Sequence, residues 1–116
     1  MVDSEIKGQG YRVWLDPSTR TVHFEGILRL STGEYQPIEE LLNGILASEP
    51  PQLCLSMTDL QFLNSSGINM LYKFAIAARK RGSTELQVHA TNSIAWQGKS
   101  LPNLKKFMPS ITITLD

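Results

Sequence analysis

The sequence is poor in cysteine and histidine and has no excess of charge of either sign. Its 116 residues include one cysteine, Cys54, so an internal disulfide and a cysteine-rich metal site are both excluded. Eleven basic and eleven acidic residues cancel, which leaves out the electrostatic footprint of a nucleic-acid-binding protein. We therefore expect no cofactor, no metal ion and no direct contact with nucleic acid.

Long apolar runs are also missing. No stretch approaches the roughly 20 apolar residues that span a bilayer, and the polar start of the chain does not resemble a signal peptide. These absences predict a cytoplasmic protein that does not contact a membrane. The hydrophobic fraction of 41% is typical of a globular protein, and the length fits a single domain. We expect a flexible tail over residues 1–10 and one domain over residues 11–116.

Alternating apolar and polar residues predict two strands near the start of the chain. Residues 11–15 and residues 22–30 both have the period of a half-buried strand. The segment Asp16–Arg20 between them contains a proline, an aspartate and a serine, which favour a turn. The pattern therefore predicts an antiparallel hairpin.

Helices and strands alternate over the rest of the chain. Pro37 suits the first turn of a helix, and Pro50 and Pro51 end that helix. The predicted elements are a helix over residues 37–48, a strand over 53–57, a polar loop over 58–63, a helix over 65–81, a strand over 86–90, a short helix over 94–100 and a strand over 111–115. The near-continuous apolar run 53–57 predicts a strand covered on both faces. The order ββαβαβαβ indicates an α/β domain with a mainly parallel sheet and right-handed crossovers.

Asn64-Ser65-Ser66-Gly67 opens the longest predicted helix. The side-chain oxygen of Asn64 is suited to cap that helix. Free backbone N–H groups and the positive end of the helix dipole meet at the same point, where a phosphate would be stabilised. A serine hydroxyl there is open to phosphorylation, although the same residues also fit a helix start with no further role.

The segment MTDLQFLNSSGINML, residues 57–71, resembles the Asp-Ser-Ser-Gly signature of the STAS domain, the family of bacterial anti-sigma-factor antagonists. Residues 24–28 look like the second strand of that family, and the order of elements agrees over about residues 11–115. Asn64 stands where the family usually has aspartate, so the capping group is kept and the charge is lost.

The resemblance implies a non-catalytic module that changes partners on phosphorylation. Ser66 matches the serine that is phosphorylated in the family, with Ser65 as the alternative acceptor. The implied partners are an anti-sigma factor that is also a serine kinase of the histidine-kinase-like ATPase class, and a PP2C-type phosphatase that removes the phosphate. The implied partner-binding residues are Asp59, Asn64, Ser65, Ser66, Gly67 and Asn69.

Two other functions have to be weighed against this one. Asparagine at position 64 favours a constitutive STAS scaffold or small-ligand sensor that does not switch. A serine hydrolase would need a base beside Ser66, but His23 and His89 both fall in predicted strands, and the Gly-x-Ser-x-Gly motif is absent. We therefore expect that the protein is not an enzyme.

Overall fold

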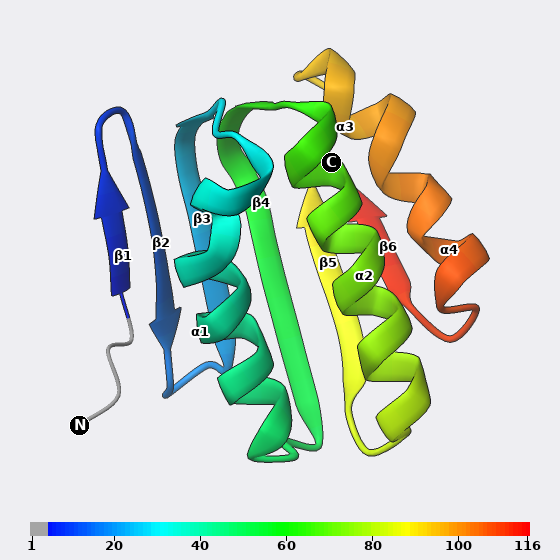
Figure 1. The fold of residues 1–116 in the computed structure, drawn as a ribbon. Helices are drawn as coiled ribbons and strands as arrows, with labels where there is room; N and C mark the ends of the chain where they lie inside the picture. The colour runs from blue at the N-terminus through cyan, green and yellow to red at the C-terminus, as the bar shows by residue number, and fades with distance from the viewer. Residues whose placement is uncertain (1–4) are drawn as a thin grey trace.

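The computed structural model describes residues 5–116, which form a six-stranded mixed sheet (Figure 1). The strands lie side by side in chain order: β1 (Glu5–Gly8), β2 (Tyr11–Asp16), β3 (Thr21–Leu28), β4 (Gln52–Leu63), β5 (Glu85–Ala90) and β6 (Thr112–Leu115). β1, β2 and β3 pair antiparallel, whereas β3, β4, β5 and β6 pair parallel. The predicted α/β class, with an N-terminal hairpin followed by parallel strands, is confirmed.

The helices all cover the same face of this sheet (Figure 1). They are α1 (Gln36–Ala47), which follows the 3₁₀ turn η1 (Thr32–Tyr35), then α2 (Ser65–Arg81), α3 (Ala95–Ser100), η2 (Leu101–Asn103) and α4 (Leu104–Phe107). Each crossover adds its strand on the same side of the growing sheet. Crossovers of one hand then place every helix on one face, and no helix of residues 5–116 lies on the opposite face.

The burial of β4 follows from this one-sided cover. Leu53, Leu55 and Met57 are almost completely buried beneath the helices, whereas Cys54 and Ser56 alternate with them and are half-buried. The prediction of a strand covered on both faces was wrong. A continuous apolar run suggests two covered faces, but here the residues that point away from the helices are only a cysteine and a serine.

The predicted polar loop 58–63 is the second half of β4. Leu60 and Leu63 are 0% and 3% exposed, and they lie opposite Gly26 and Leu28 of β3. Register shifts between His23 and Glu25 and between Gly26 and Ile27 accommodate the change in alternation. The loop prediction was wrong because pairing with β3 and burial of these leucines outweigh the polar character of their neighbours.

The expected tail also contains a strand. Ile6 of β1 lies opposite Val13 and packs against the core, and Arg12 bonds to Glu5. The prediction of a tail over residues 1–10 was wrong for residues 5–8, where four residues are too few to show a clear alternation. Residues 1–4 of that tail lie outside the described residues.

The core lies between the sheet and the helices. Leu42 of α1 and Leu71 and Phe74 of α2 are buried against the leucines of β4. α2 has its predicted bounds and ends at Gly82 in the left-handed conformation, with φ 68°. None of the helices within residues 5–116 combines the length and the apolar character that crossing a membrane requires.

Candidate functional site

Asn64 joins the first turn of α2 to the segment that follows β3. Its Oδ1 accepts from the Gly67 N–H at 3.0 Å and from the Tyr35 hydroxyl at 2.5 Å. Its Nδ2 donates to the Leu30 carbonyl at 2.8 Å. The predicted N-cap is confirmed, and the amide also holds two more distant segments against the helix.

The bond to Leu30 gives a physical reason for asparagine at position 64. An ionised aspartate has no donor, so its second oxygen would face the Leu30 carbonyl oxygen that Nδ2 now meets at 2.8 Å. The Tyr35 hydroxyl also lies 3.2 Å from the Leu28 carbonyl. Burial raises the pKa of Tyr35, which keeps its phenol protonated and able to donate.

Gly67 allows α2 to approach the end of β4 closely. A Cβ at this position would collide with Cδ1 of Leu63 and lie 2.7 Å from the Tyr35 hydroxyl oxygen. Gly67 is itself buried. The glycine of the Ser-Ser-Gly triplet is therefore required by packing in this chain.

The two serines differ in exposure and contacts. Ser65 is exposed, whereas Ser66 is half-buried and its Oγ shares a hydrogen bond with Thr32 Oγ1 at 3.2 Å. Both lie in the first turn of α2, which contains no acidic residue to offset the positive end of the helix dipole. A negative charge on either hydroxyl would be stabilised by that end of the helix.

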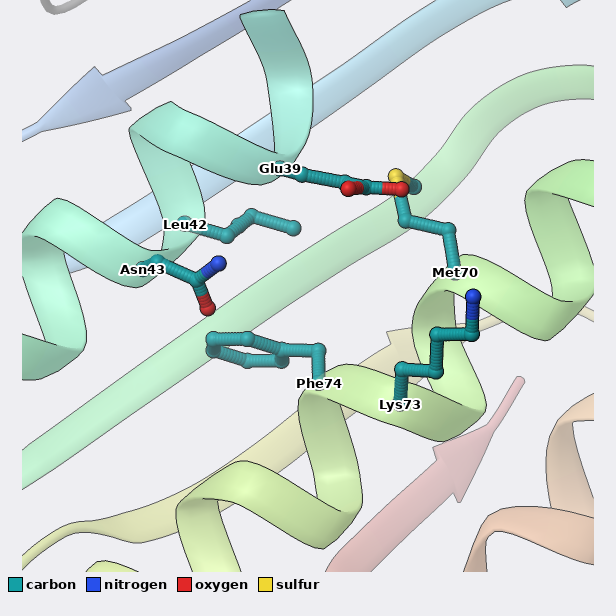
Figure 2. A pocket seen from close by; sticks show the side chains of 6 residues that line it. All are labelled: Glu39, Leu42, Asn43, Met70, Lys73 and Phe74. Carbon is teal, nitrogen blue, oxygen red and sulfur yellow. The ribbon is translucent and has the colours of Figure 1, made fainter. Parts of the chain in front are cut away.

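Ser66 lines an open hollow of about 270 Å³, which we call the Ser66 hollow. It is bordered by η1 and α1 on one side and by α4 on the other, and its lining includes Thr32, Glu39, Asn69, Lys73, Ile76 and Phe107. A smaller hollow of about 130 Å³ between α1 and α2 shares Glu39, Met70 and Lys73 with it. Figure 2 shows side chains of α1 and α2 pointing toward one another across this smaller hollow.

The structure brings together five of the six predicted partner-binding residues. Asn64, Ser65, Ser66, Gly67 and Asn69 lie at the cap and in the first two turns of α2. The sixth residue, the aspartate at position 59, is exposed in β4, opposite a glutamate of β3, and belongs to no loop. The predicted cluster is thus assembled at the start of α2 without its aspartate.

The two histidines lie apart from the serines. His23 and His89 flank Ser56 in neighbouring strands and share with it the face of the sheet that carries no helix. Ser65 and Ser66 lie in the helical layer on the other face. Neither Ser65 nor Ser66 therefore has a histidine beside it to act as the base of a hydrolase. Within the described residues, no three His, Cys, Asp or Glu side chains are grouped so as to hold a metal ion.

Gln97 supports the end of β4 and was missed by the sequence analysis. Its side chain is fully buried; Nε2 donates to the carbonyls of Met57 and Leu60 at 2.7 and 3.0 Å, and Oε1 accepts from the Thr91 N–H at 2.9 Å. Trp96 Nε1 also donates to Leu60 O. β4 continues beyond its pairing with β5, so these side chains bond carbonyls that would otherwise be unpaired. A single glutamine in a short helix forms no sequence pattern from which this role could be predicted.

Comparisons with known proteins identify the fold. No family model and no curated protein matches the sequence. A chain of the crystal structure of the diguanylate cyclase SiaD in complex with its activator SiaC, from Pseudomonas aeruginosa, is similar with a TM-score of 0.72 and 16% identity, over 98% of this chain and 100% of that one. SiaC of Pseudomonas aeruginosa is similar with a TM-score of 0.68 and 17% identity, over the whole of both chains.

The third similar structure bears directly on the predicted family resemblance. It is an anti-sigma factor antagonist from Mycobacterium paratuberculosis, with a TM-score of 0.56 and 20% identity over 93% of this chain and 81% of that one. The element order, the hairpin and parallel strands, and the Asn-Ser-Ser-Gly helix start agree with this similarity. The chain therefore has a STAS-like fold.

Proposed function

We propose that this protein is a non-catalytic regulatory module that binds a partner protein through the start of α2, and that phosphorylation of Ser66 controls the binding. One observation carries the proposal. The Ser66 hydroxyl lines an open hollow and, within residues 5–116, its side chain hydrogen-bonds to Thr32 alone, whereas the neighbouring Asn64 and Gly67 are fully engaged in structural contacts.

A phosphate at this point would change the surface in a defined way. It would add about −1.5 to −2 charges, which the N-terminus of α2 stabilises. It would also replace the contact with Thr32 and stand in the same hollow as the Glu39 carboxylate. A partner that covers the Ser66 hollow would have to desolvate both negative groups, which is costly without a cation of its own.

The proposed modifying partners come from the signature that this chain resembles. They are a serine kinase of the histidine-kinase-like ATPase class that also acts as an anti-sigma factor, and a PP2C-type phosphatase. Support comes from the Asn-Ser-Ser-Gly segment and from the fold shared with an anti-sigma factor antagonist. Ser65 is the alternative acceptor because its side chain is the more exposed of the two.

A constitutive module without a phosphate switch is the second candidate. The structural bonds of Asn64 favour it, because they explain this residue without any regulatory role. The similarity to the activator SiaC supports a related form of this candidate, in which the partner is a diguanylate cyclase. The two candidates differ in whether a negative charge at position 66 changes partner binding.

Phosphorylation is tested by incubating the full chain with ATP and each candidate kinase, followed by mass spectrometry. We expect one phosphate, which Ser66→Ala abolishes and Ser65→Ala retains. The reverse pattern would assign the site to Ser65. Absence of phosphate on both serines, with a kinase that binds the protein, would overturn the proposed switch.

Partner affinity then separates the two candidates. We expect Ser66→Glu to weaken binding about tenfold or more, because the added charge is buried in the complex. Ser110→Glu is the matched control, since Ser110 is exposed before β6, away from the start of α2. Unchanged affinity of Ser66→Glu in isothermal titration calorimetry would favour the constitutive module.

A further inference from the structure

The helical layer is divided by charge, although the whole chain is neutral. The η1–α1 side contains only acidic charged residues: Glu34, Glu39 and Glu40. The α2–α4 side contains only basic ones: Lys73, Arg79, Lys80 and Arg81 on α2, and Lys99, Lys105 and Lys106 on α3 and α4. The Ser66 hollow lies at the boundary between the two sides.

The α2 and α4 walls of the Ser66 hollow combine apolar side chains with one lysine. Tyr72, Ile76 and Phe107 are half-buried there, and the rings of Tyr72 and Phe107 stack at 4.7 Å between centroids. Lys73 is exposed in the same lining, and within residues 5–116 its ammonium group has no carboxylate close enough for an ion pair. These walls therefore offer apolar contact beside a lysine that has no ion-pair partner among residues 5–116, while Glu39 of α1 lines the same hollow.

We propose that the Ser66 hollow receives an acidic amphipathic helix of the partner protein. This inference rests on the proposed function and specifies the chemistry of its partner. Apolar side chains of that helix pack against Tyr72, Ile76 and Phe107, and its carboxylates lie toward Lys73. Glu39 on the opposite wall repels the same carboxylates and so sets the orientation of the helix.

The charge of the proposed acidic helix also explains why phosphorylation of Ser66 would weaken its binding. A phosphate there adds negative charge beside Glu39, at the point where the acidic helix enters. The phosphate therefore adds to the repulsion that Glu39 exerts on the carboxylates of the partner helix. An acidic partner is repelled more strongly than a neutral or basic one would be.

A designed peptide tests the chemistry without knowledge of the partner. The probe has leucine at positions i, i+3, i+4 and i+7 of a helix and glutamate at its other surface positions. The control peptide has lysine in place of every glutamate. With the ¹⁵N-labelled full chain, we expect the acidic peptide to shift the amide signals of Tyr72, Lys73 and Ile76. Equal affinity for both peptides, or shifts only on the helix-free face of the sheet, would overturn the proposal.

Charge reversal at one lysine provides the matched comparison. Lys73→Glu should weaken binding of the acidic peptide about threefold to tenfold, the range expected for loss and reversal of an exposed pair. Lys80→Glu makes the same change about 10 Å farther along α2, beyond a Debye length at physiological salt, and should weaken it less than twofold. Equal losses of peptide affinity in the two variants would show a general effect of charge and would overturn the proposal that the peptide binds in the Ser66 hollow. Thermal melting confirms that both variants fold.

Ser66→Glu separates failure of this inference from failure of the proposed function. Acidic-peptide binding that depends on Lys73 but is unchanged by Ser66→Glu would support the docking hollow and count against the switch. Phosphorylation of Ser66 without any binding of the acidic peptide would support the switch and overturn the inference. If both proposals hold, the acidic peptide binds to the Ser66→Glu variant more weakly than to the original protein.

Discussion

Asn64 bonds both to a residue close to it in the sequence and to residues far from it. Its cap on α2 was predictable because the accepting oxygen and the Gly67 N–H are three residues apart. Its bonds to Tyr35 and Leu30 join residues 29 and 34 positions away in the chain, and no local pattern contains them. The sequence therefore predicted the cap of α2 but did not reveal why an amide occupies this position.

Substitutions at Asn64 separate the local bond from the distant ones. Asn64→Ala should lower the free energy of unfolding by about 1–3 kcal/mol, since it removes the cap and leaves the partly buried groups around it unpaired. Asn64→Ser keeps a capping oxygen but cannot reach Leu30 as the amide does, so a smaller loss is expected. Urea denaturation measures the free energy of unfolding of both variants. A serine variant as stable as the original protein would show that the distant bonds add nothing.

β4 shows how tertiary contacts set the length of an element. The apolar half of this strand was predicted from its run of hydrophobic residues. The half beyond Met57 was not, because it depends on a register-shifted pairing with β3 and on carbonyl partners supplied by Gln97. Helix α2 was predicted to the residue because its cap, its apolar stripe and Gly82 all lie within its own sequence.

Two helical glycines should respond in opposite directions to alanine. Gly67→Ala should destabilise the fold by about 1–3 kcal/mol, because the new methyl group meets Leu63 and Tyr35 in a packed core. Gly44→Ala in α1 places its methyl in open space and should stabilise the fold by about 0.5–1 kcal/mol through better helix propensity. Chemical denaturation of both variants checks this pair. A stabilised Gly67→Ala protein would contradict the close approach of α2 to β4.

At the scale of the molecule, the alternation of helices and strands predicted the fold class, because the order of elements alone restricts the topology. The face that the helices leave bare, and the split between acidic and basic sides, were not predictable from composition. Both arise only when distant segments are placed side by side. In the helical layer, the acidic residues of η1 and α1 and the basic residues of α2, α3 and α4 lie on different sides of the Ser66 hollow.

The ionisable groups predict how stability varies with pH. Hydrogen bonds from Ser18 and Ser31 hold the pKa values of Asp16 and Glu34 below their ordinary values. These carboxylates stabilise the fold above their unfolded pKa values of about 4, and the contribution is lost as pH falls through the lower folded values. Burial raises the pKa values of Cys54 and Tyr35, so their contribution is present below their unfolded values and is lost at alkaline pH.

Melting temperature should therefore be highest near neutral pH, falling in acid below about pH 4 and in alkali above about pH 9. Thermal melts in a pH series measure this profile. Cys54→Ala removes one of the two groups with a raised pKa and should reduce the alkaline decrease without altering the acid one. A melting temperature that rises between pH 8 and pH 10 would contradict the raised pKa values.

The hydrogen bonds of Gln97 and Asn64 lie on the two sides of the junction between β4 and α2. They have a thermodynamic consequence for the binding of a partner protein. Gln97 fixes the end of β4 and Asn64 fixes the start of α2, so this surface has its shape before any partner arrives. A partner that bound there would cost this protein little conformational entropy. The heat capacity of association should then follow the apolar area buried, with no added contribution from folding of this surface. A partner that orders its own segment would carry nearly the whole entropic cost of the complex.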